Sequence, residues 1–339
     1  MKLFFTTLLT KIWQILNKYK INRLLSSKTN LEIDYFLSKL DPRLRVMIGL
    51  TYFCQCKCAH CGMGFFSKNK ERELTTKEWI NFIESLSFKK TKMVYFFGGE
   101  PLLRNDIFQL INKAKEKGFL TMLDTNGYLL SDAMAKKLKK AGLDVIEVSI
   151  DNSEAKIHDS LRGIEGVFER AVSGIKNCLK EKIFCILSTY ATTEYIQSGE
   201  LERIISLGEK LGVNQIRILS PVLTGKWLDK EKIKLNNKER KKIKEIIGKT
   251  STFSFLEDEY CLSVNKKLLY ISPYGEVQSC PYLPFSFGNI KEELLGKILK
   301  KIWKHPMFRI KTKKCLMNNE EFRRRYLGKL EQKFPVDLR

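Results

Sequence analysis

Four cysteines fall within the eight residues Cys54–Cys61, and this spacing constrains the chain more than any other feature of its sequence. In a reducing compartment, thiolates this close together favour binding of a metal ion or an iron–sulfur cluster. Three of them, at positions 54, 58 and 61, are spaced so that a short loop can cover one face of a four-iron cluster. Three cysteines would leave one of its four irons open to a small ligand.

The fourth cysteine of this group, Cys56, leaves a second interpretation open. If all four thiols were ligands, the segment would be a closed zinc or iron–sulfur knot without an open position. Side chains alternate between the two faces of an extended chain, so Cys54 and Cys58 would point away from Cys56. We therefore expect Cys56 to be a small buried residue rather than a ligand.

The composition is that of an ordinary globular protein of 339 residues, with 43% hydrophobic and 29% charged residues. Its nine cysteines are too unevenly placed for a disulfide scaffold, which favours metal binding in a reducing cytosol. The net charge of +23 would suit a nucleic-acid-binding protein, but most of the excess is lysine spread along helical stretches. Without a compact arginine–aromatic patch, nucleic-acid binding is the less favoured interpretation.

The segment Met1–Ser27 combines a broad apolar helical face, which includes Trp13, with surrounding basic residues. It lacks the uninterrupted apolar run and the small-residue cleavage site of a signal peptide. No apolar run in the chain reaches the ~18–20 residues that span a bilayer. Two interpretations remain, a helix packed on the barrel and a helix lying at a membrane surface. We expect a cytoplasmic protein, with peripheral contact at the inner membrane face as the second alternative.

Beyond residue 44 the sequence alternates short apolar runs with helical patterns. Strands are predicted at 46–52, 93–97, 119–123, 145–150, 184–189 and 213–219. Helices are predicted at 75–86, 107–117, 131–141, 166–179 and 201–211, several of them with a capping residue or a terminal glycine. This α/β pattern predicts a right-handed parallel sheet curved into a partial (β/α)6 barrel. In such sheets the loops after the strands carry the chemistry.

A second motif, Gly98-Gly99-Glu100-Pro101, follows the predicted strand at 93–97 directly. Two glycines allow the backbone to approach a ligand closely, and the adjacent carboxylate can receive an ammonium group. A free amino acid presents such an ammonium group. A Gly-Gly turn alone is common, but its place one strand after the cysteine loop favours a ligand site.

With these two motifs the chain resembles the radical S-adenosylmethionine (SAM) superfamily, in the branch that carries a SPASM domain or a shorter twitch domain after the barrel. The resemblance runs from about residue 45 to about residue 308. It includes three further stretches, which are Asp124-Thr125-Asn126-Gly127, Val148-Ser149-Ile150-Asp151, and Leu161-Arg162-Gly163 followed by Gly166-Val167-Phe168.

The resemblance implies which residues bind the cofactors. The catalytic residues that would hold a SAM-cleaving [4Fe-4S] cluster are Cys54, Cys58 and Cys61. The residue expected near the adenine is His60, and those expected to meet the amino group of SAM are Gly98, Gly99 and Glu100. The expected ribose and carboxylate contacts are Ser149 and Arg162, and further residues of the pocket are Thr125, Asn126 and Asp151. For the polar residues at 125, 126, 149 and 162, an ordinary strand end or helix cap is the alternative.

The pattern changes after Trp227. Cys261 and Cys280 flank two short β runs joined by a turn at 273–276, which predicts a hairpin. This part resembles the first half of a SPASM or twitch domain, but only Cys315 follows where a full SPASM domain has a second cysteine-rich half. The resemblance implies that these three cysteines bind an auxiliary iron–sulfur cluster, with an open iron or a fourth ligand other than cysteine. Alternatively, they are remnants in a domain that no longer binds iron.

The expected organisation has four regions. They are an amphipathic helix and connector at 1–44, the barrel at 45–225, a small α+β twitch/SPASM-like domain at 226–320 and a basic tail at 321–339. The resemblance implies a radical SAM oxidoreductase or transferase that cleaves SAM to a 5′-deoxyadenosyl radical and takes hydrogen from a substrate carbon. We expect a peptide or small-metabolite substrate, with a lipid or lipid-linked one as alternative, and an electron donor such as flavodoxin or ferredoxin. A basic iron–sulfur or zinc protein that binds nucleic acid without SAM chemistry is the rival class.

Overall fold

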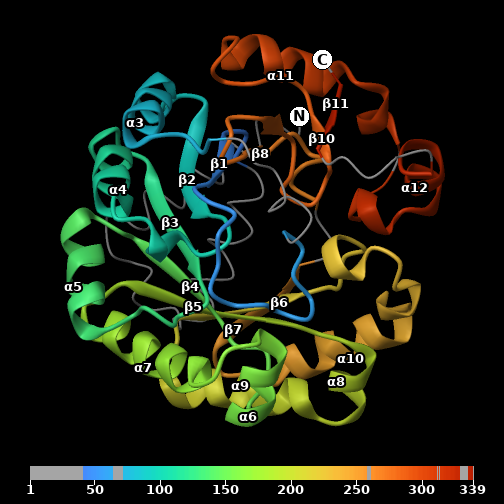
Figure 1. The fold of residues 1–339 in the computed structure, drawn as a ribbon. Coiled ribbons are helices and arrows are strands. Elements are labelled where there is room, and N and C mark those ends of the chain that lie inside the picture. The colour runs from blue at the N-terminus through green and yellow to red at the C-terminus, as the bar shows by residue number, and fades with distance from the viewer. Residues whose placement is uncertain are drawn as a thin grey trace, which may run out of the picture.

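Nine strands form one curved sheet in the part of the chain that the computed structural model describes, which is residues 41–63, 72–257, 261–310, 312, 314–328 and 335–338 (Figure 1). Seven of them run parallel in chain order: β1 (Leu44–Gly49), β2 (Thr91–Phe97), β3 (Leu120–Thr125), β4 (Val145–Ser149), β5 (Phe184–Tyr190), β6 (Gln215–Leu219) and β7 (Phe253–Glu257). The predicted α/β partial barrel is confirmed. The amphipathic segment predicted at 1–27 lies outside the described residues.

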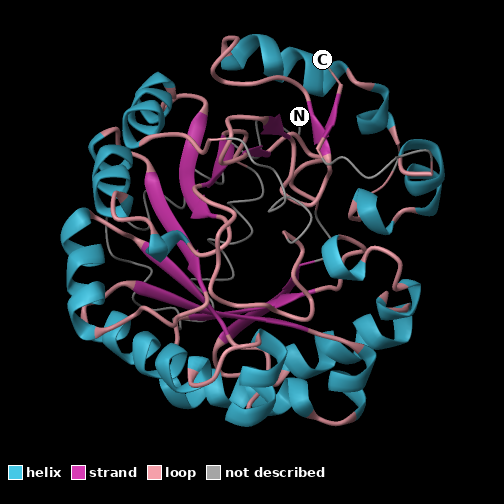
Figure 2. Ribbon diagram, viewed as in Figure 1, coloured by secondary structure: helices cyan, strands magenta, loops and turns pink. Residues whose placement is uncertain are grey.

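The helices lie on the outer side of the curved sheet (Figure 2). Those that connect the barrel strands are α3 (Thr76–Ser85), α4 (Ile107–Glu116), α5 (Asp132–Ala141), α6 (Ala155–Arg162), α7 (Val167–Lys180), α8 (Thr193–Gln197), α9 (Glu200–Leu211) and α10 (Asn237–Gly248). Short helical turns occur at η3 (Pro101–Leu103), η4 (Gly225–Trp227) and η5 (Glu231–Ile233). No helix among the described residues has both the length and the apolar character needed to cross a bilayer.

The predicted helix ends are confirmed by their caps. Thr75 accepts a hydrogen bond from the backbone of Glu78, whose carboxylate accepts one from the Thr75 backbone at 2.8 Å. Ser131 caps α5, and Gly142 ends it in the left-handed region with φ 94°. These signals depend on neighbouring residues only, which is why the sequence carries them.

Three strands join the sheet that the sequence analysis did not place there. β7 extends it beyond β6, and β8 (Leu268–Ile271) pairs in parallel with β1 at the other end. β8 also pairs antiparallel with β9 (Val277–Gln278), which confirms the predicted hairpin. The sheet therefore has more strands than the six predicted. A strand of five residues with no following helix, such as β7, leaves only a weak periodic signal.

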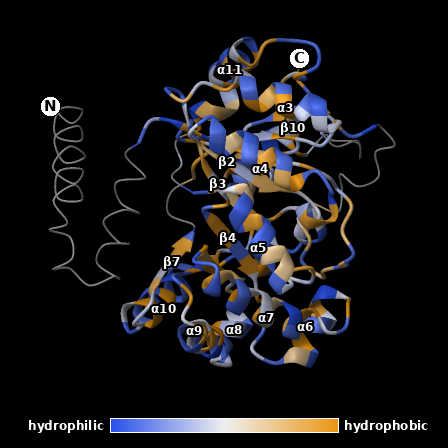
Figure 3. Ribbon diagram, turned by 90° about the vertical axis from the view of Figure 1, so that its left-hand side faces the viewer, coloured by the Kyte–Doolittle hydropathy of each residue, from blue (hydrophilic) through white to orange (hydrophobic). Residues whose placement is uncertain are grey.

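The rest of the C-terminal part covers the end of the sheet near β8. It consists of α11 (Leu295–Lys304), η6 (Pro306–Arg309), η7 (Leu316–Asn318), α12 (Glu320–Tyr326) and the pair β10 (Phe285–Ser286) and β11 (Val336–Asp337). Hydrophobic residues gather on strands such as β4 and β7 in Figure 3. Alternate residues of the strands pack against the helices, among them Ile48, Phe96 and Ile146, which are fully buried. The other strand face lines an interior cavity.

Candidate active site

The cysteine loop follows β1 and is held from two sides by backbone hydrogen bonds. On one side, Lys57 and Ala59 donate to carbonyls at the end of α6, each at 2.8 Å. On the other side, Gly99 donates to the Thr51 carbonyl at 2.7 Å and Glu100 donates to the Phe53 carbonyl at 2.9 Å. The loop is thereby fixed between the end of α6 and the motif after β2.

The glycine at position 99 permits this approach. A Cβ atom there would lie 2.2 Å from the Phe53 carbonyl oxygen and 2.7 Å from that of Tyr52. Gly98 adds a backbone conformation with φ 147°, which side-chain-bearing residues rarely adopt. The two glycines thus bring the cysteine loop and Glu100 together, whereas the motif had been interpreted as a close approach of the backbone to a ligand.

The thiols of the cysteine loop sit among hydrogen-bond donors. The Asn126 amide lies 3.7 Å from the Cys54 sulfur, and the Arg162 guanidinium lies 3.8 Å from that of Cys58. The Cys56 thiol and then the Arg162 guanidinium lower the pKa of Cys58 to about 6. Thiolates are the form that binds metal, so this loop fits an iron–sulfur cluster.

Cys56 corrects part of the sequence analysis. The residue is buried, as expected, with 8% of its surface exposed. However, its thiol contacts those of Cys54 and Cys58 rather than pointing away from them. The alternation argument failed because residues 54–58 form no strand.

Glu100, one of the residues expected to meet the amino group of SAM, is fully buried. Its carboxylate accepts hydrogen bonds from the Thr125 hydroxyl at 2.9 Å, the Asn126 backbone at 2.9 Å and the Leu102 backbone at 3.0 Å. Burial raises the pKa of Glu100 to about 7 in spite of these bonds. The structure therefore brings together three of the predicted pocket residues, Glu100, Thr125 and Asn126.

Asp151, after β4, connects two other predicted residues. Its carboxylate lies 2.5 Å from the Arg162 guanidinium and 3.4 Å from His60. Burial opposes its charge, but the Arg162 guanidinium lowers the pKa of Asp151 below its usual value. Arg162 is thus paired with Asp151 and the Cys58 sulfur in the structure, whereas the resemblance placed it on the SAM carboxylate.

His60 lies in an aromatic recess. Its ring centre is 4.5 Å from that of Tyr190 and 5.7 Å from that of Trp227. Burial lowers the pKa of His60 to about 4, so the ring is neutral at physiological pH. Aromatic rings arranged in this way can receive a flat base such as adenine.

The three later cysteines share one local geometry. The backbone N–H of Tyr282 donates to the Cys280 sulfur at 3.5 Å, and the backbone N–H groups two and three residues beyond Cys261 and Cys315 lie close to those two sulfurs. Burial raises the pKa of all three thiols, while these donors favour the charged form. Hydrogen bonds to sulfur are a regular feature of iron–sulfur sites, so this set also fits a cluster.

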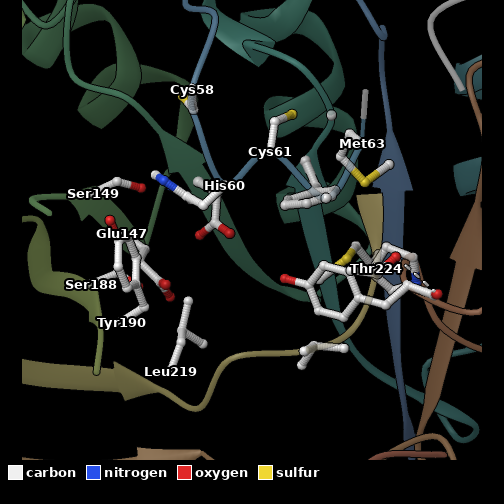
Figure 4. Close-up of a pocket in the computed structure, with 18 of the residues that line it drawn as sticks. Cys58, His60, Cys61, Met63, Glu147, Ser149, Ser188, Tyr190, Leu219 and Thr224 are labelled. Atoms are coloured by element: carbon white, nitrogen blue, oxygen red, sulfur yellow. Dashed lines mark hydrogen bonds between the residues drawn. The ribbon is translucent and has the colours of Figure 1, made fainter. Parts of the chain in front are cut away.

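One cavity of about 1070 Å³ is lined by both cysteine groups. Figure 4 shows Cys58 and Cys61 from the loop across the same space as Glu147, Ser149, Ser188 and Tyr190, which extend from neighbouring strands. The volume is at the upper end of the ~300–1,000 Å³ usual for one drug-sized ligand. The cavity therefore has room for more than one bound group.

An ionic layer crosses the inner face of the sheet, and the sequence analysis did not predict it. It consists of Tyr95, Asp124, Glu147, Arg217 and Glu257, from five different strands, all lining the cavity. Arg217 contacts Glu147 at 2.6 Å and pairs with Glu257, and the Tyr95 hydroxyl donates to Asp124 at 2.5 Å. Burial, with the neighbouring Glu147 carboxylate, raises the pKa of Asp124 well above its usual value. The signal that could have found this layer is the placement of polar residues at alternate positions of otherwise apolar strands.

Comparisons with known proteins match the two parts of the chain that contain the cysteine groups. The family model of the radical SAM superfamily matches residues 48–205, and that of the SPASM iron–sulfur cluster-binding domain matches residues 261–329. An AdoMet-dependent heme synthase of Methanosarcina barkeri is 28% identical over 290 residues, which are 76% of this chain and 82% of that protein. The Fe-coproporphyrin III synthase of the same organism is 37% identical over 143 residues, 42% of this chain and 36% of that protein.

Solved structures with the same fold are more distant in sequence. Streptococcus suis SuiB bound to the precursor peptide SuiA has a TM-score of 0.63 at 16% identity, covering 88% of this chain and 79% of that one. The enzyme anSMEcpe with bound AdoMet has a TM-score of 0.60 at 16% identity, covering 82% of this chain and 85% of that one. At this identity the likeness concerns the fold.

Proposed function

Because the chain belongs to the radical SAM superfamily and carries a SPASM domain, we propose that it abstracts hydrogen from a substrate carbon inside the cavity between its two cysteine groups. The single observation that carries the proposal is that both groups line one cavity. When bound, the [4Fe-4S] cluster and SAM supply the 5′-deoxyadenosyl radical that takes the hydrogen atom.

The protein's own residues would bind and orient these groups. Cys54, Cys58 and Cys61 would hold the first cluster, with the Asn126 amide and the Arg162 guanidinium donating to two of the sulfurs. Glu100, in its ionised form, would receive the amino group of SAM. The lowered pKa of Cys58 supports this assignment because it favours the thiolate at neutral pH.

The adenine would occupy the recess formed by His60, Tyr190 and Trp227. Gly98 and Gly99 would allow SAM to approach the backbone, and Ser149 lines the cavity near this recess. The neutral state of His60 supports stacking on an uncharged base. Asp151 would act through Arg162, with which it forms an ion pair, and through the neutral His60 ring, which lies 3.4 Å from its carboxylate.

Cys261, Cys280 and Cys315 would hold the auxiliary cluster, at the other side of the cavity. A substrate between the two groups would face the ionic layer on the sheet. That layer has three carboxyl groups for one guanidinium, and the guanidinium is already paired with two of them. The excess of carboxyl groups over cations favours a substrate with N–H donors, such as a peptide or an amine-bearing metabolite.

A tetrapyrrole substrate is the second candidate. It is favoured by the AdoMet-dependent heme synthase, whose similarity extends over 82% of that relative. The paired state of Arg162 and Arg217 is less suited to a ligand with several carboxylates, because neither cation is free to receive them. Incubation of reduced enzyme and SAM with Fe-coproporphyrin III distinguishes the two candidates by its absorption spectrum.

The test of the proposed function is 5′-deoxyadenosine formation by anaerobically reconstituted protein under strong reductant. A variant with Cys54, Cys58 and Cys61 all changed to Ala is expected to lose SAM cleavage but to keep about four irons per chain. Cys178→Ala removes a buried cysteine outside both groups and serves as the control. Loss of all iron in the triple variant would contradict the auxiliary cluster, and absence of SAM cleavage in wild type would contradict the function.

A further inference from the structure

The segment Pro221–Trp227, here called the bridging loop, follows β6 and contacts both cysteine groups. It contributes several side chains to the cavity wall, among them Thr224 and Lys226. This loop is therefore a direct physical connection between the two cysteine groups.

The bridging loop lies directly against the backbone of the first cysteine group. The Lys226 backbone donates to the Cys61 carbonyl at 3.1 Å. The Lys226 ammonium donates to the Cys58 carbonyl at 2.6 Å and to the Lys57 carbonyl at 3.2 Å. Gly225 allows this approach, because a Cβ atom at its position would lie 2.2 Å from the Cys61 carbonyl oxygen.

The other end of the bridging loop is anchored at the auxiliary cysteines. The Asn318 amide donates to the Pro221 carbonyl at 2.8 Å, and its oxygen accepts from the Leu223 backbone at 3.0 Å. The backbone N–H of the same Asn318 donates to the Cys315 carbonyl at 3.2 Å. One residue therefore contacts both an auxiliary cysteine and the bridging loop.

Lys226 and Arg162 both place a positive charge beside Cys58, but only Arg162 is paired with a carboxylate among the described residues. Arg162 is neutralised by Asp151 at 2.5 Å. Within the described residues, Lys226 forms no ion pair with a carboxylate, and its hydrogen bonds fix the ammonium over the carbonyl of a cluster-binding residue. A fixed positive charge favours the state with one more electron nearby.

We propose that Lys226 raises the reduction potential of the cluster held by Cys54, Cys58 and Cys61, and that Asn318 positions it through the bridging loop. The inference rests on the proposed binding of that cluster by these three cysteines. Asn318 is the positioning residue in this role, whereas Lys226 acts on the cluster through the charge that it holds over the backbone of the cysteine loop. The auxiliary site would thereby influence how readily the first cluster accepts its electron.

The experiment is a redox titration of the first cluster, followed by electron paramagnetic resonance, in the reconstituted full-length protein. Lys226→Gln, which keeps an N–H donor and removes the charge, is expected to shift the reduction equilibrium at least threefold toward the oxidised cluster. A threefold change in this equilibrium corresponds to about 28 mV in the reduction potential of a one-electron couple, for which a tenfold change corresponds to 59 mV. Lys226→Arg is expected to keep the wild-type potential. Lys230→Gln, at an exposed position just beyond the loop, is the control and should show no shift.

Asn318→Ala tests the connection, because it removes the side-chain bonds to the bridging loop and keeps the backbone N–H of that position. It is expected to lower the potential in the same direction, with little further change when combined with Lys226→Gln. An unchanged potential in Lys226→Gln, at equal iron content, overturns the inference and leaves the proposed function intact. An unchanged potential in Asn318→Ala overturns the inferred influence of the auxiliary site on the first cluster. A wild type without a SAM-binding cluster overturns the proposed function itself.

Discussion

Removal of the Arg217 guanidinium tests whether the ionic layer is a stabilising feature of the barrel interior. Arg217 contacts Glu147 at 2.6 Å, and the side chains are 15% and 3% exposed. At an effective dielectric constant of about 20, unit charges ~4 Å apart interact by ~4 kcal/mol. Breaking a buried pair on one side costs about 3–5 kcal/mol, since a buried charge is left without a partner. The Glu257 side chain is 34% exposed, so that pair adds less.

We therefore expect Arg217→Met to lower the free energy of unfolding by about 3–5 kcal/mol. Urea unfolding followed by far-UV circular dichroism, on proteins of equal iron content, measures this change. The double variant Arg217→Met with Glu147→Gln should recover part of the loss, because the buried carboxylate of Glu147 is then no longer left without a partner. Arg72→Met, which removes an exposed ion pair, is the matched control and should leave the midpoint nearly unchanged. A loss in Arg217→Met no larger than in this control would refute the reasoning.

Three further predictions concern the candidate site. Because burial raises the pKa of Glu100 to about 7 and an ammonium ligand requires its ionised form, SAM affinity measured calorimetrically should increase from about pH 6 to about pH 8. The raised pKa of Glu100 also contributes to the free energy of unfolding: this contribution is fully present below pH 4.5, the ordinary pKa of a glutamate, and is lost as the pH rises through about 7. Glu100→Gln removes the titrating group and should flatten the pH profiles of both SAM affinity and stability. Gly99→Ala should reduce iron binding at the first site, since its Cβ would meet the Phe53 carbonyl at 2.2 Å, whereas Gly248→Ala, with nothing within 4 Å, should retain it. Cys56→Ala should keep both iron and SAM cleavage if this thiol is not a ligand, and loss of iron would restore the four-thiolate interpretation.

Much of the fold could be predicted from the sequence because its signals are local. The capping box of Thr75 and Glu78, the terminal Gly142 and the apolar runs of β1 to β6 depend on residues close together in the chain. The cysteines at 54–61 and the motif at 98–101 are local in the same way. Short spacing brings their atoms together whatever the rest of the chain does.

The tertiary structure alone decided which distant residues meet. Tyr95 and Arg217 are joined in one ionic layer only because β2 and β6 curve toward one another across the cavity. The same holds for Asn318 and the bridging loop, which are 95 positions apart at Leu223. The Cys56 thiol turned toward its neighbours because contacts from α6 and β2, rather than strand alternation, set the backbone of its loop. Motif spacing thus determined the chemistry that the chain can hold, and closure of the sheet determined the surroundings in which that chemistry occurs.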